Sequence, residues 1–515
     1  MLRTVISALL LALAFANLNL EFLAWFGFLP FFFAVNNSHN KKQSFILGFA
    51  CGAIFWLGTI YWLAYVTAAG MLLLVLYLAL YWGVFGLYVW WARSRSSIFK
   101  VFFIPALWVL LEYCRSYFMT GFPWALLGYS QHKALTLIQT ADITGAWGVS
   151  FMVMMANAAI YEIIRGAVSR EKNNSAISAI AVSCLFLCAA FYGASRMDFF
   201  TKAGSLDKKA LKVSVVQGSI PQELKWDSNA VEYIMQRYIS LSHQAAQEKP
   251  DLLIWPEASV PAILTEDSDF TAGLMQMAQD AGIHLLAGAV TSRAGDYYNS
   301  AVLFRPEGGR DIYDKLHLVP FGEYIPLPGI FGFLQTIVPI GEVKRGLDYK
   351  IFALPVGGSA SGAKFSCLIC FEDLFPELSR RFVSAGAGFL VTVTNDAWYQ
   401  RTSAPFQHFQ ASVFRAIENR VPMVRSANTG VSGFIGPLGS VEGLVKDTAG
   451  NAIFVPGSLT RRISIPAQGL TVYTQSGDWF ILLCSLIFLL GVLNICYNTF
   501  PKSGRRLCSS LQRSR

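Results

Sequence analysis

The uneven placement of apolar residues constrains this chain more than any other feature. Its 515 residues are 54% hydrophobic and only 14% charged, whereas a soluble protein carries about a quarter charged residues. The charge deficit lies before Met197 and again after Asp478. We therefore expect seven transmembrane helices in residues 1–198, a water-facing domain over 210–466, and a last helix with a basic tail over 477–515.

Eight apolar segments make up the two membrane regions, and most are long enough to cross hydrocarbon as helices, which takes about 20 residues. They are Thr4–Ala16, Phe22–Val35, Phe45–Val66, Met71–Ala92, Val101–Met119, Ile143–Ile164, Ala176–Gly193 and Trp479–Tyr497. The first segment also has the pattern of a cleaved signal peptide, because Arg3 precedes an apolar run that ends in Ala14-Phe15-Ala16. The sequence leaves open whether the first segment is a retained helix or a cleaved signal peptide. In both cases the later spans have the same orientation in the membrane.

The basic residues between the spans predict that orientation. They gather in alternate connections, at Lys41, Lys42, Arg93, Arg95, Lys100, Arg165, Arg170 and Lys172, and again in the tail after residue 500. The intervening connections 17–21 and 67–70 carry none, and 120–142 carries only Lys133. Because basic loops stay in the cytoplasm, the water-facing domain is expected on the outer side, which in a bacterial inner membrane is the periplasm.

Composition and cysteine use exclude several classes of protein. The formal net charge of +9 flanks apolar spans and forms no single basic face, so we expect no nucleic-acid partner. The histidines and carboxylates show no metal-binding spacing, so we expect neither a metal nor another cofactor. Of nine cysteines, only Cys367 and Cys370 fall in the water-facing domain. In an extended strand their Cα atoms would lie about 10 Å apart, too far for a disulfide, so a redox pair requires that the strand prediction be wrong.

The water-facing domain reads as alternating strands and helices, which is typical of an α/β domain. Strands are expected over Leu211–Gln217, Leu252–Trp255, His284–Thr291, Asn299–Phe304, Asp311–Leu318, Phe389–Thr394, Met423–Ser426 and Gly433–Ile435, and helices over Ala230–Gln247, Phe270–Ala281 and His408–Asn419. The stretch Lys364–Glu372, KFSCLICFE, is typical of one more strand, mostly buried. The sequence shows no internal repeat.

Three of the expected strand ends carry a reactive side chain: Glu257, Lys315 and Cys370. Ligands gather where the strands of an α/β sheet stop, so their joint placement favours a catalytic site over three unrelated residues. After Cys370 the chain changes from strand to helix, and Asp373 is expected to cap that helix. Because amide dipoles at a helix start favour an anion, we expect a thiolate at Cys370.

Several motifs here resemble those of the carbon–nitrogen hydrolase (nitrilase) superfamily. They are VVQGSIP at Val215–Pro221, WPEASVP at Trp255–Pro261, CLICFED at Cys367–Asp373 and TVTNDAW at Thr392–Trp398. With apolar spans on both sides, the chain from Leu2 to Phe500 resembles the membrane branch of that superfamily, the apolipoprotein N-acyltransferase family. TGFPWALLGYSQ at Thr120–Gln131, KLHLVPFGEYIP at Lys315–Pro326 and QHFQASVFRAIENR at Gln407–Arg420 fit that family as well.

The resemblance implies an α-β-β-α sandwich on a bundle of about eight membrane helices. It also implies an activity: a phospholipid gives a fatty acyl chain to the amino group of the diacylglyceryl-cysteine that begins an apolipoprotein. We expect a monomer, although the sequence does not reveal whether the protein acts alone. By motif position, Cys370 would be the nucleophile, Glu257 the general base and Lys315 the oxyanion-stabilising cation. Further family positions fall on Glu323, Asn299, Trp226, Phe371 and Glu372, and Trp398 is expected at the rim of the site. The family often has Tyr where this chain has Phe371, which puts a role for that hydroxyl in doubt.

Two other functions use the same sequence features. A membrane-tethered amidase for a soluble substrate would use the same three residues, and a transporter with an accessory domain would need polar residues along its spans, which are scarce. The apolar segment Phe321–Ile340 favours the lipid substrates, since it suits a mobile lid that dips into the bilayer at the mouth of the site. A packed loop of the core is the alternative for that segment.

Overall fold

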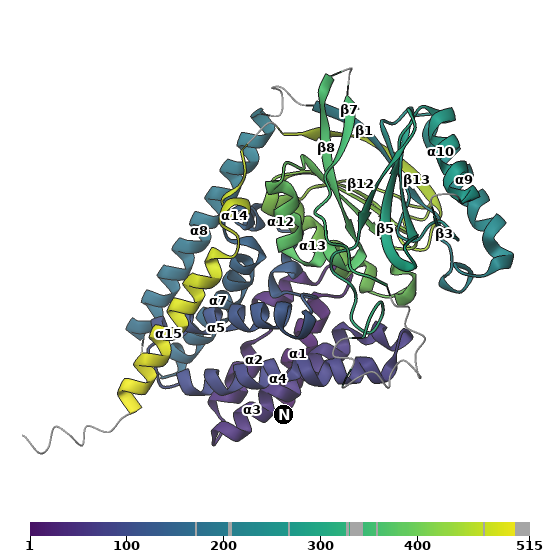
Figure 1. Cartoon of the computed structure of the whole chain (residues 1–515). Helices are drawn as coiled ribbons and strands as arrows, with labels where there is room; N and C mark the ends of the chain where they lie inside the picture. The colour runs from purple at the N-terminus through teal and green to yellow at the C-terminus, as the bar shows by residue number, and fades with distance from the viewer. Residues whose placement is uncertain are drawn as a thin grey trace, which may run out of the picture.

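Apolar segments near both ends of the chain form a helical bundle in the computed structural model, and the residues between them form two sheets covered by helices (Figure 1). The structure describes residues 1–169, 172–203, 209–265, 268–325, 329, 343–356, 359–466 and 469–499. The bundle contains α1 (Leu2–Ala14), α2 (Leu29–Asn36), α3 (Lys41–Thr59), α4 (Ala68–Ala92), α5 (Ser97–Tyr117), α6 (Leu135–Ile138), α7 (Ala141–Ser169), α8 (Lys172–Ala203) and α15 (Trp479–Thr499), with the short α14 (Val472–Ser476) just before α15.

The expected membrane-helical part is confirmed in outline, whereas the number of spans stays a prediction. Within the described residues, four helices are long and apolar enough to cross a membrane: Ala68–Ala92, Ser97–Thr120, Ala141–Val168 and Ser178–Phe200. Leu2–Ala14, Glu21–Asn36 and Trp479–Asn494 are shorter apolar helical segments. The second expected span is not continuous, because the 3₁₀ helix Glu21–Trp25 is separate from α2.

Small residues let two of these helices pack unusually closely. A Cβ atom at Gly48 of α3 would lie 2.2 Å from the carbonyl oxygen of Trp82, and one at Gly86 of α4 would lie 2.5 Å from that of Ser44. Glycine at both positions therefore permits the close approach of α3 and α4, as is usual for helices packed within membranes.

Two sheets form the centre of the water-facing domain. The first has the order β13-β1-β2-β4-β5-β6, with β3 beside β4, and the second has the order β12-β11-β10-β9-β8-β7. The strands are β1 (Lys209–Gln217), β2 (Leu252–Ile254), β3 (Ile263–Leu264), β4 (His284–Arg293), β5 (Asp296–Phe304), β6 (Arg310–Asp314), β7 (Phe352–Val356), β8 (Ser359–Ile369), β9 (Phe389–Thr394), β10 (Met423–Ala427), β11 (Gly433–Ile435), β12 (Val441–Leu444) and β13 (Gly457–Ile465). The Ser426 hydroxyl of β10 donates to the carbonyls of Val216 and Ile254, which joins the two sheets face to face.

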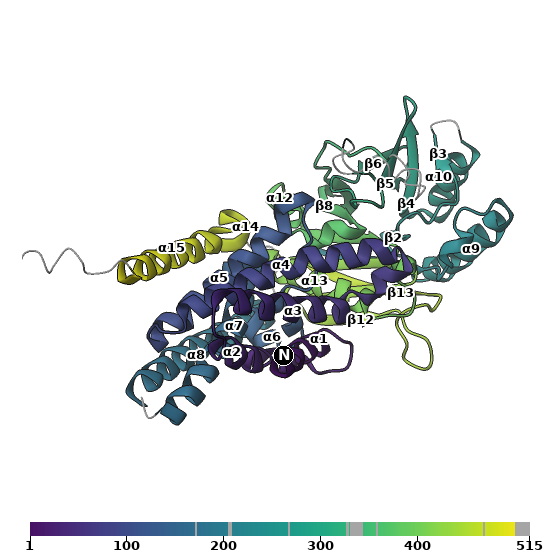
Figure 2. The ribbon, with the colours of Figure 1, turned by 90° about the horizontal axis from the view of Figure 1, so that it is seen from below.

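Helices cover both outer faces of this sandwich. α9 (Val231–Ala246) and α10 (Asp269–Ala281) pack on the first sheet through a separate apolar core. α12 (Pro376–Ser384) and α13 (Ala404–Asn419) cover the second sheet and lie between it and the bundle (Figures 1 and 2). The expected α-β-β-α sandwich is therefore confirmed.

Most of the expected strands form, and one ends early for a clear reason. β9 and β11 have the expected bounds, but the strand expected over Asp311–Leu318 stops at Asp314. The amides of Leu316 and His317 donate to the carboxylate of Glu372 instead of to a neighbouring strand. The strand prediction at Lys364–Glu372 is also confirmed up to Ile369, and Cys367 and Cys370 are both free thiols.

Helix α13 attaches the sandwich to the bundle at two places. Near its start, the side-chain oxygen of Gln407 accepts hydrogen bonds from the indole groups of Trp62 and Trp124. At its end lie four buried charged residues that we call the docking cluster: Asp142, Arg415, Glu418 and Arg420. Arg420 pairs with Asp142 of α7 at 2.9 Å, and Glu418 accepts the amide of Ala146 at 3.0 Å.

Candidate active site

Cys370 sits in a sharp turn at the end of β8. Its φ is +54°, a left-handed conformation that costs a residue with a side chain about 1–2 kcal/mol. The 3₁₀ helix Cys370–Leu374 follows, and α12 then starts at Pro376, with Phe375 as an N-cap that forms no side-chain hydrogen bond. The prediction that Asp373 caps this helix is wrong, because its carboxylate is buried against Arg425, His408 and Ser412.

The expected thiolate at Cys370 is also wrong for the resting protein. Burial and the negative charge of Glu257 raise the pKa of the thiol well above its usual value. The ammonium of Lys315 and a hydrogen bond from the Thr394 hydroxyl oppose this rise but do not outweigh it. The thiol is therefore protonated at neutral pH and needs a base before it can act as a nucleophile.

Glu257 follows β2 and is held by hydrogen bonds at both carboxylate oxygens. The side-chain amide of Asn299 in β5 donates to Oε1 at 2.8 Å, and the backbone amide of Asn395 donates to Oε2 at 2.8 Å. Asn299 also donates to Glu323 at 2.8 Å, so it links the two carboxylates. Bonds to both oxygens fix the direction in which the carboxylate faces.

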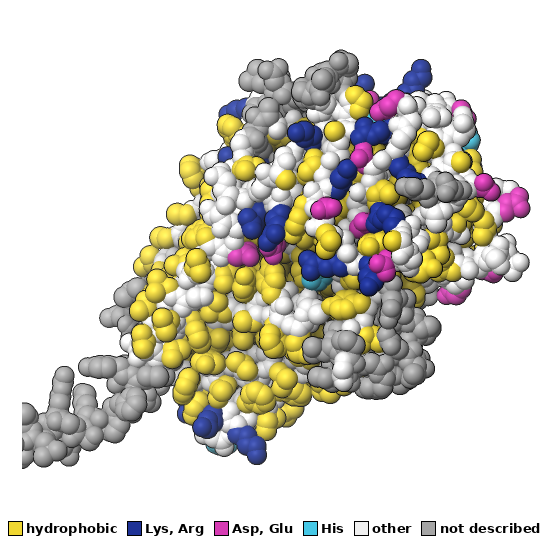
Figure 3. Space-filling model, viewed as in Figure 1, with side chains coloured by type: hydrophobic (Ala, Val, Ile, Leu, Met, Phe, Trp, Pro, Cys, Tyr) yellow, Lys and Arg dark blue, Asp and Glu magenta, His cyan; other side chains and the backbone are white. Residues whose placement is uncertain are grey.

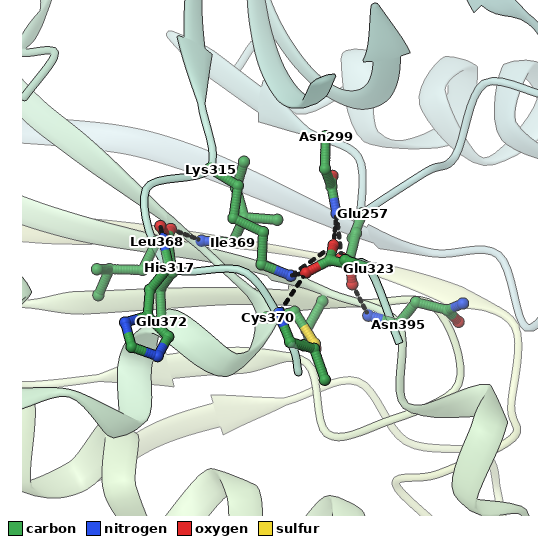
Figure 4. A network of polar contacts seen from close by, with 12 residues as sticks. Glu257, Asn299, Lys315, His317, Glu323, Leu368, Ile369, Cys370, Glu372 and Asn395 are labelled. Atoms are coloured by element: carbon green, nitrogen blue, oxygen red, sulfur yellow. Dashed lines mark hydrogen bonds and ion pairs between the residues drawn. The ribbon is translucent and has the colours of Figure 1, made fainter. Parts of the chain in front are cut away.

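Lys315 directly follows β6 and lies between two carboxylates (Figure 4). Its Nζ is 2.9 Å from Glu323 and 3.7 Å from Oε1 of Glu257. Burial alone would lower the pKa of this ammonium, but the charges of Glu323 and Glu257 raise it well above its usual value. Lys315 therefore stays a cation, and both its charge and that of Glu257 act on the thiol of Cys370.

Glu372 joins the Lys315 segment to the Cys370 turn. Its buried carboxylate accepts the amide of Ile369 at 2.7 Å on one side and the amides of Leu316 and His317 at 2.6 and 3.0 Å on the other. The hydroxyl of Tyr313 donates to the same carboxylate. Burial raises the pKa of Glu372 to about 7, although these amides and Lys315 oppose the rise.

The structure places a second buried lysine at this site, and no motif in the sequence marks it. The ammonium of Lys225 donates to the backbone carbonyls of Glu257 and Ala258 at 2.8 and 2.9 Å. Ala258 has a φ of +45°, so Lys225 stabilises the strained turn that presents Glu257. Burial lowers the pKa of Lys225 to about 8, while Glu257 and Cys370 oppose this change. The only signal in the sequence is the position of Lys225 beside Trp226.

The remaining expected residues differ in how deeply they are buried. Phe371 is buried and packs against Phe375 and Phe122 with ring centroids 5.2 and 6.5 Å apart. Trp226 and Trp398 are 54% and 49% exposed, and their part in the site stays a prediction. Most of the expected lid Phe321–Ile340 lies outside the described residues; Phe321 itself is 42% exposed.

The described residues include no group of three His, Cys, Asp or Glu side chains that could hold a metal ion. The arrangement instead offers a protonated thiol, a fixed carboxylate that can accept its proton, and a permanent cation that can stabilise an oxyanion. These are the requirements for moving an acyl group through a covalent intermediate.

Comparisons with known proteins cover both parts of the chain. Residues 7–159 match the apolipoprotein N-acyltransferase N-terminal domain, and residues 212–453 match the carbon–nitrogen hydrolase domain. The apolipoprotein N-acyltransferase of Geobacter metallireducens is 38% identical over 94% of this chain and 92% of its own length. The apolipoprotein N-acyltransferase of Haemophilus influenzae is 30% identical over 95% of this chain and 93% of its own length.

Among solved structures, the chain is similar to Saccharomyces cerevisiae Nit3, described as a member of branch 10 of the nitrilase superfamily. The sequence identity is 17%, the match covers 50% of this chain and 90% of that one, and the TM-score is 0.38. An amidase of the nitrilase superfamily from Nesterenkonia sp. AN1 matches with 19% identity over 53% of this chain and 96% of that one, with a TM-score of 0.38.

Proposed function

This chain belongs to the apolipoprotein N-acyltransferase family, and we propose that it moves a fatty acyl chain from a membrane phospholipid to the amino group of an apolipoprotein's diacylglyceryl-cysteine. The observation that carries the proposal is the convergence of Glu257, Lys315 and Cys370 in a domain attached to an apolar bundle. We assign Cys370 as the nucleophile, Glu257 as the general base and Lys315 as the cation that stabilises the oxyanion.

In the first half of the reaction, Glu257 takes the thiol proton as the sulfur of Cys370 attacks the ester carbonyl of the phospholipid. The tetrahedral intermediate carries an oxyanion next to Lys315, and losing one such stabilising donor typically costs about 3–4 kcal/mol of barrier. The intermediate collapses to a thioester, and Glu257 returns the proton to the departing lysophospholipid oxygen. The first product leaves before the second substrate enters, which gives ping-pong kinetics.

In the second half, the amine of the diacylglyceryl-cysteine attacks the thioester. Glu257 accepts a proton from the amine, the carbon–sulfur bond breaks, and the sulfur leaves and is reprotonated. A thioester suits both halves, since it forms from an ester and an amine displaces it readily. Asn299 and the amide of Asn395 support these steps by fixing the carboxylate of Glu257.

The bundle is needed because both proposed substrates are lipids, and exposing their chains to water costs about 0.8 kcal/mol per CH₂. Its helices present large apolar side chains outward, among them Leu73 of α4, Phe191 of α8 and Leu482 of α15. Hydrophobic side chains dominate the lower left of the molecule in Figure 3, with lysine and arginine at its lower end and mixed charges on the opposite, upper part. This pattern supports a multi-pass protein of the bacterial inner membrane whose sandwich faces the periplasm.

A covalent adduct tests this function. The full-length protein in detergent is incubated with a diacyl phospholipid, and the mass of the peptide that carries Cys370 is measured. We expect one acyl group on Cys370, which hydroxylamine removes and a diacylglyceryl-cysteine peptide discharges to form an amide.

The Cys370→Ala variant should lose the adduct entirely. Cys367→Ala is the matched control, because that buried thiol lies three residues earlier in the same motif, and it should keep the adduct. An adduct from short amides but none from phospholipid would contradict the proposal and favour a membrane-tethered amidase.

A further inference from the structure

Four buried charged residues lie directly behind the Cys370 turn. Asp373, Asp396, His408 and Arg425, which we call the Cys370 cluster, are each no more than 1% exposed. They come from four different places: the Cys370 turn, the turn after β9, helix α13 and strand β10. The catalytic steps proposed above do not use any of them.

His408 contacts two turns at once. Its Nε2 lies 2.8 Å from Asp373 and 3.3 Å from the carbonyl oxygen of Cys370, and its Nδ1 lies 2.9 Å from Asp396. Asp396 directly follows Asn395, whose backbone amide donates to Glu257. One imidazole ring therefore touches both the turn that carries Cys370 and the turn that orients Glu257.

Arg425 repeats this bridge from the neighbouring strand. It lies 2.5 Å from Asp373 and 3.4 Å from Asp396, and Ser412 of α13 donates to Asp373 at 2.7 Å. Two carboxylates thus face two cations, provided that the imidazole carries both of its protons.

The surroundings of the ring favour that charged form. Burial would lower the pKa of His408 and Arg425 acts in the same direction, but Asp373 and Asp396 raise it to about 9. The ring of Trp124 lies against it with centroids 5.4 Å apart. Among the other groups packed near the two carboxylates, Arg415 interacts with Asp373, and Tyr399 with Asp396.

We propose that His408 is a positioning residue that sets the distance between the thiol of Cys370 and the carboxylate of Glu257, because it holds from behind both the turn that carries Cys370 and the Asn395–Asp396 turn that orients Glu257. The inference rests on the proposed function only in taking Cys370 as the nucleophile and Glu257 as its general base. It also explains how Cys370 keeps its left-handed conformation, since its carbonyl is held directly.

A role in stability alone would not account for this arrangement. Replacing buried ion pairs by apolar residues of similar volume is often neutral or stabilising, so four buried charges are a poor way to strengthen a core. Buried ion pairs and hydrogen bonds that join two turns instead restrict how those turns lie relative to each other. A displacement of about 1 Å between reacting groups can cost about 100-fold in rate.

Alkylation of Cys370 by iodoacetamide tests the proposal without any lipid substrate. The rate is measured on the full-length protein in detergent, by mass spectrometry of the Cys370 peptide. His408→Gln cannot donate in both directions, so we expect it to slow alkylation at pH 7 at least about tenfold, in line with a sub-ångström displacement. Glu418→Gln is the matched control, because it alters a buried charge on the same helix without touching the Cys370 turn, and it should stay within about twofold.

A second variant and a second readout keep the test decisive. Asp396→Asn weakens the same link from the side of Glu257 and should also slow alkylation, whatever the yield of His408→Gln. Acyl-enzyme formation by the wild type should decline above pH 9, and the His408 variant should lack that decline.

Equal alkylation rates in His408→Gln and wild type, or equal slowing in Glu418→Gln, would overturn the proposal. An altered alkylation rate with no acyl adduct from phospholipid would overturn the proposed function and leave this inference standing.

Discussion

The Cys370 cluster and the docking cluster are built alike and hold different things. Each brings two carboxylates and two cations together in a buried position against helix α13, with ion pairs of 2.5 to 3.4 Å. The Cys370 cluster connects two turns within the sandwich: one carries Cys370, and the other orients Glu257. The second connects α13 to α7 of the bundle. The comparison shows that buried charge has no fixed role: the elements that it joins decide whether it affects chemistry or attachment.

The sharpest way to separate the clusters is to remove one guanidinium from each. Arg425→Met leaves Asp373 and Asp396 with one cation between them, and breaking a buried pair typically costs about 3–5 kcal/mol. We expect a loss of unfolding free energy of that size, together with a fall in acyl-enzyme formation of about 100-fold per folded molecule, because both turns are released. Thermal unfolding and adduct formation measure the two effects. Asp373→Asn in the same chain should recover part of the stability, and its failure to do so would argue against an uncompensated charge.

Arg420→Met in the docking cluster should cost less and should spare the chemistry. Asp142 keeps Tyr192 at 2.7 Å and Arg196 at 3.3 Å after the change, so we expect a loss at the lower end of the range, about 3 kcal/mol. The rate of Cys370 alkylation per folded molecule should stay within about twofold of the wild-type rate, since no bond to the Cys370 turn or to the turn that orients Glu257 is lost. A strong fall in that rate would show that the two clusters are not independent.

The smallest effect concerns pH. The folded pKa of His408 is raised to about 9 from an ordinary value of 6.5, so the stability that it contributes is complete below about pH 6.5 and is lost as the pH rises toward 9. Each tenfold gain in proton affinity is worth about 1.4 kcal/mol, so that contribution is no more than roughly 3 kcal/mol. The difference in unfolding temperature between wild type and His408→Gln should therefore shrink across that interval. Glu372 and Glu418 titrate in both proteins and cancel in the difference, and a gap that does not vary with pH would contradict the charged histidine.

The sequence predicted the elements well where the information is local. Strand β9 has the expected bounds because its sequence, FLVTVT, is a short run of residues that favour a buried strand, and all six are buried in the structure. Glu257, Lys315 and Cys370 were found because each lies near a strand end. β13 was missed, although it pairs with β1 over nine residues from Lys209↔Ile465 to Gln217↔Gly457. Its pattern is partly exposed, and its partner lies about 250 residues away along the chain, so no local signal identifies it.

Charge states were predicted less well than positions. The expected thiolate at Cys370 followed from a helix start, yet burial and Glu257 outweigh any dipole. The expected cap at Asp373 followed from its place before α12, yet Arg425 and His408, which are far along the chain, take its carboxylate. His408 itself carried no spacing that marks it, because its partners come from separate turns.

The amino-acid sequence alone determined that an apolar helical part accompanies an α/β domain, most of the strand positions and the family, and it singled out the three reactive side chains. These depend on apolar runs, periodicity and motifs, which a few neighbouring residues encode. Only the tertiary structure decided which carboxylate pairs with which cation, which groups carry a proton, and how the Cys370 turn is joined to the turn that orients Glu257. Those outcomes depend on burial and on contacts between residues far apart in the chain, because the energy of a charge is set by what surrounds it in space.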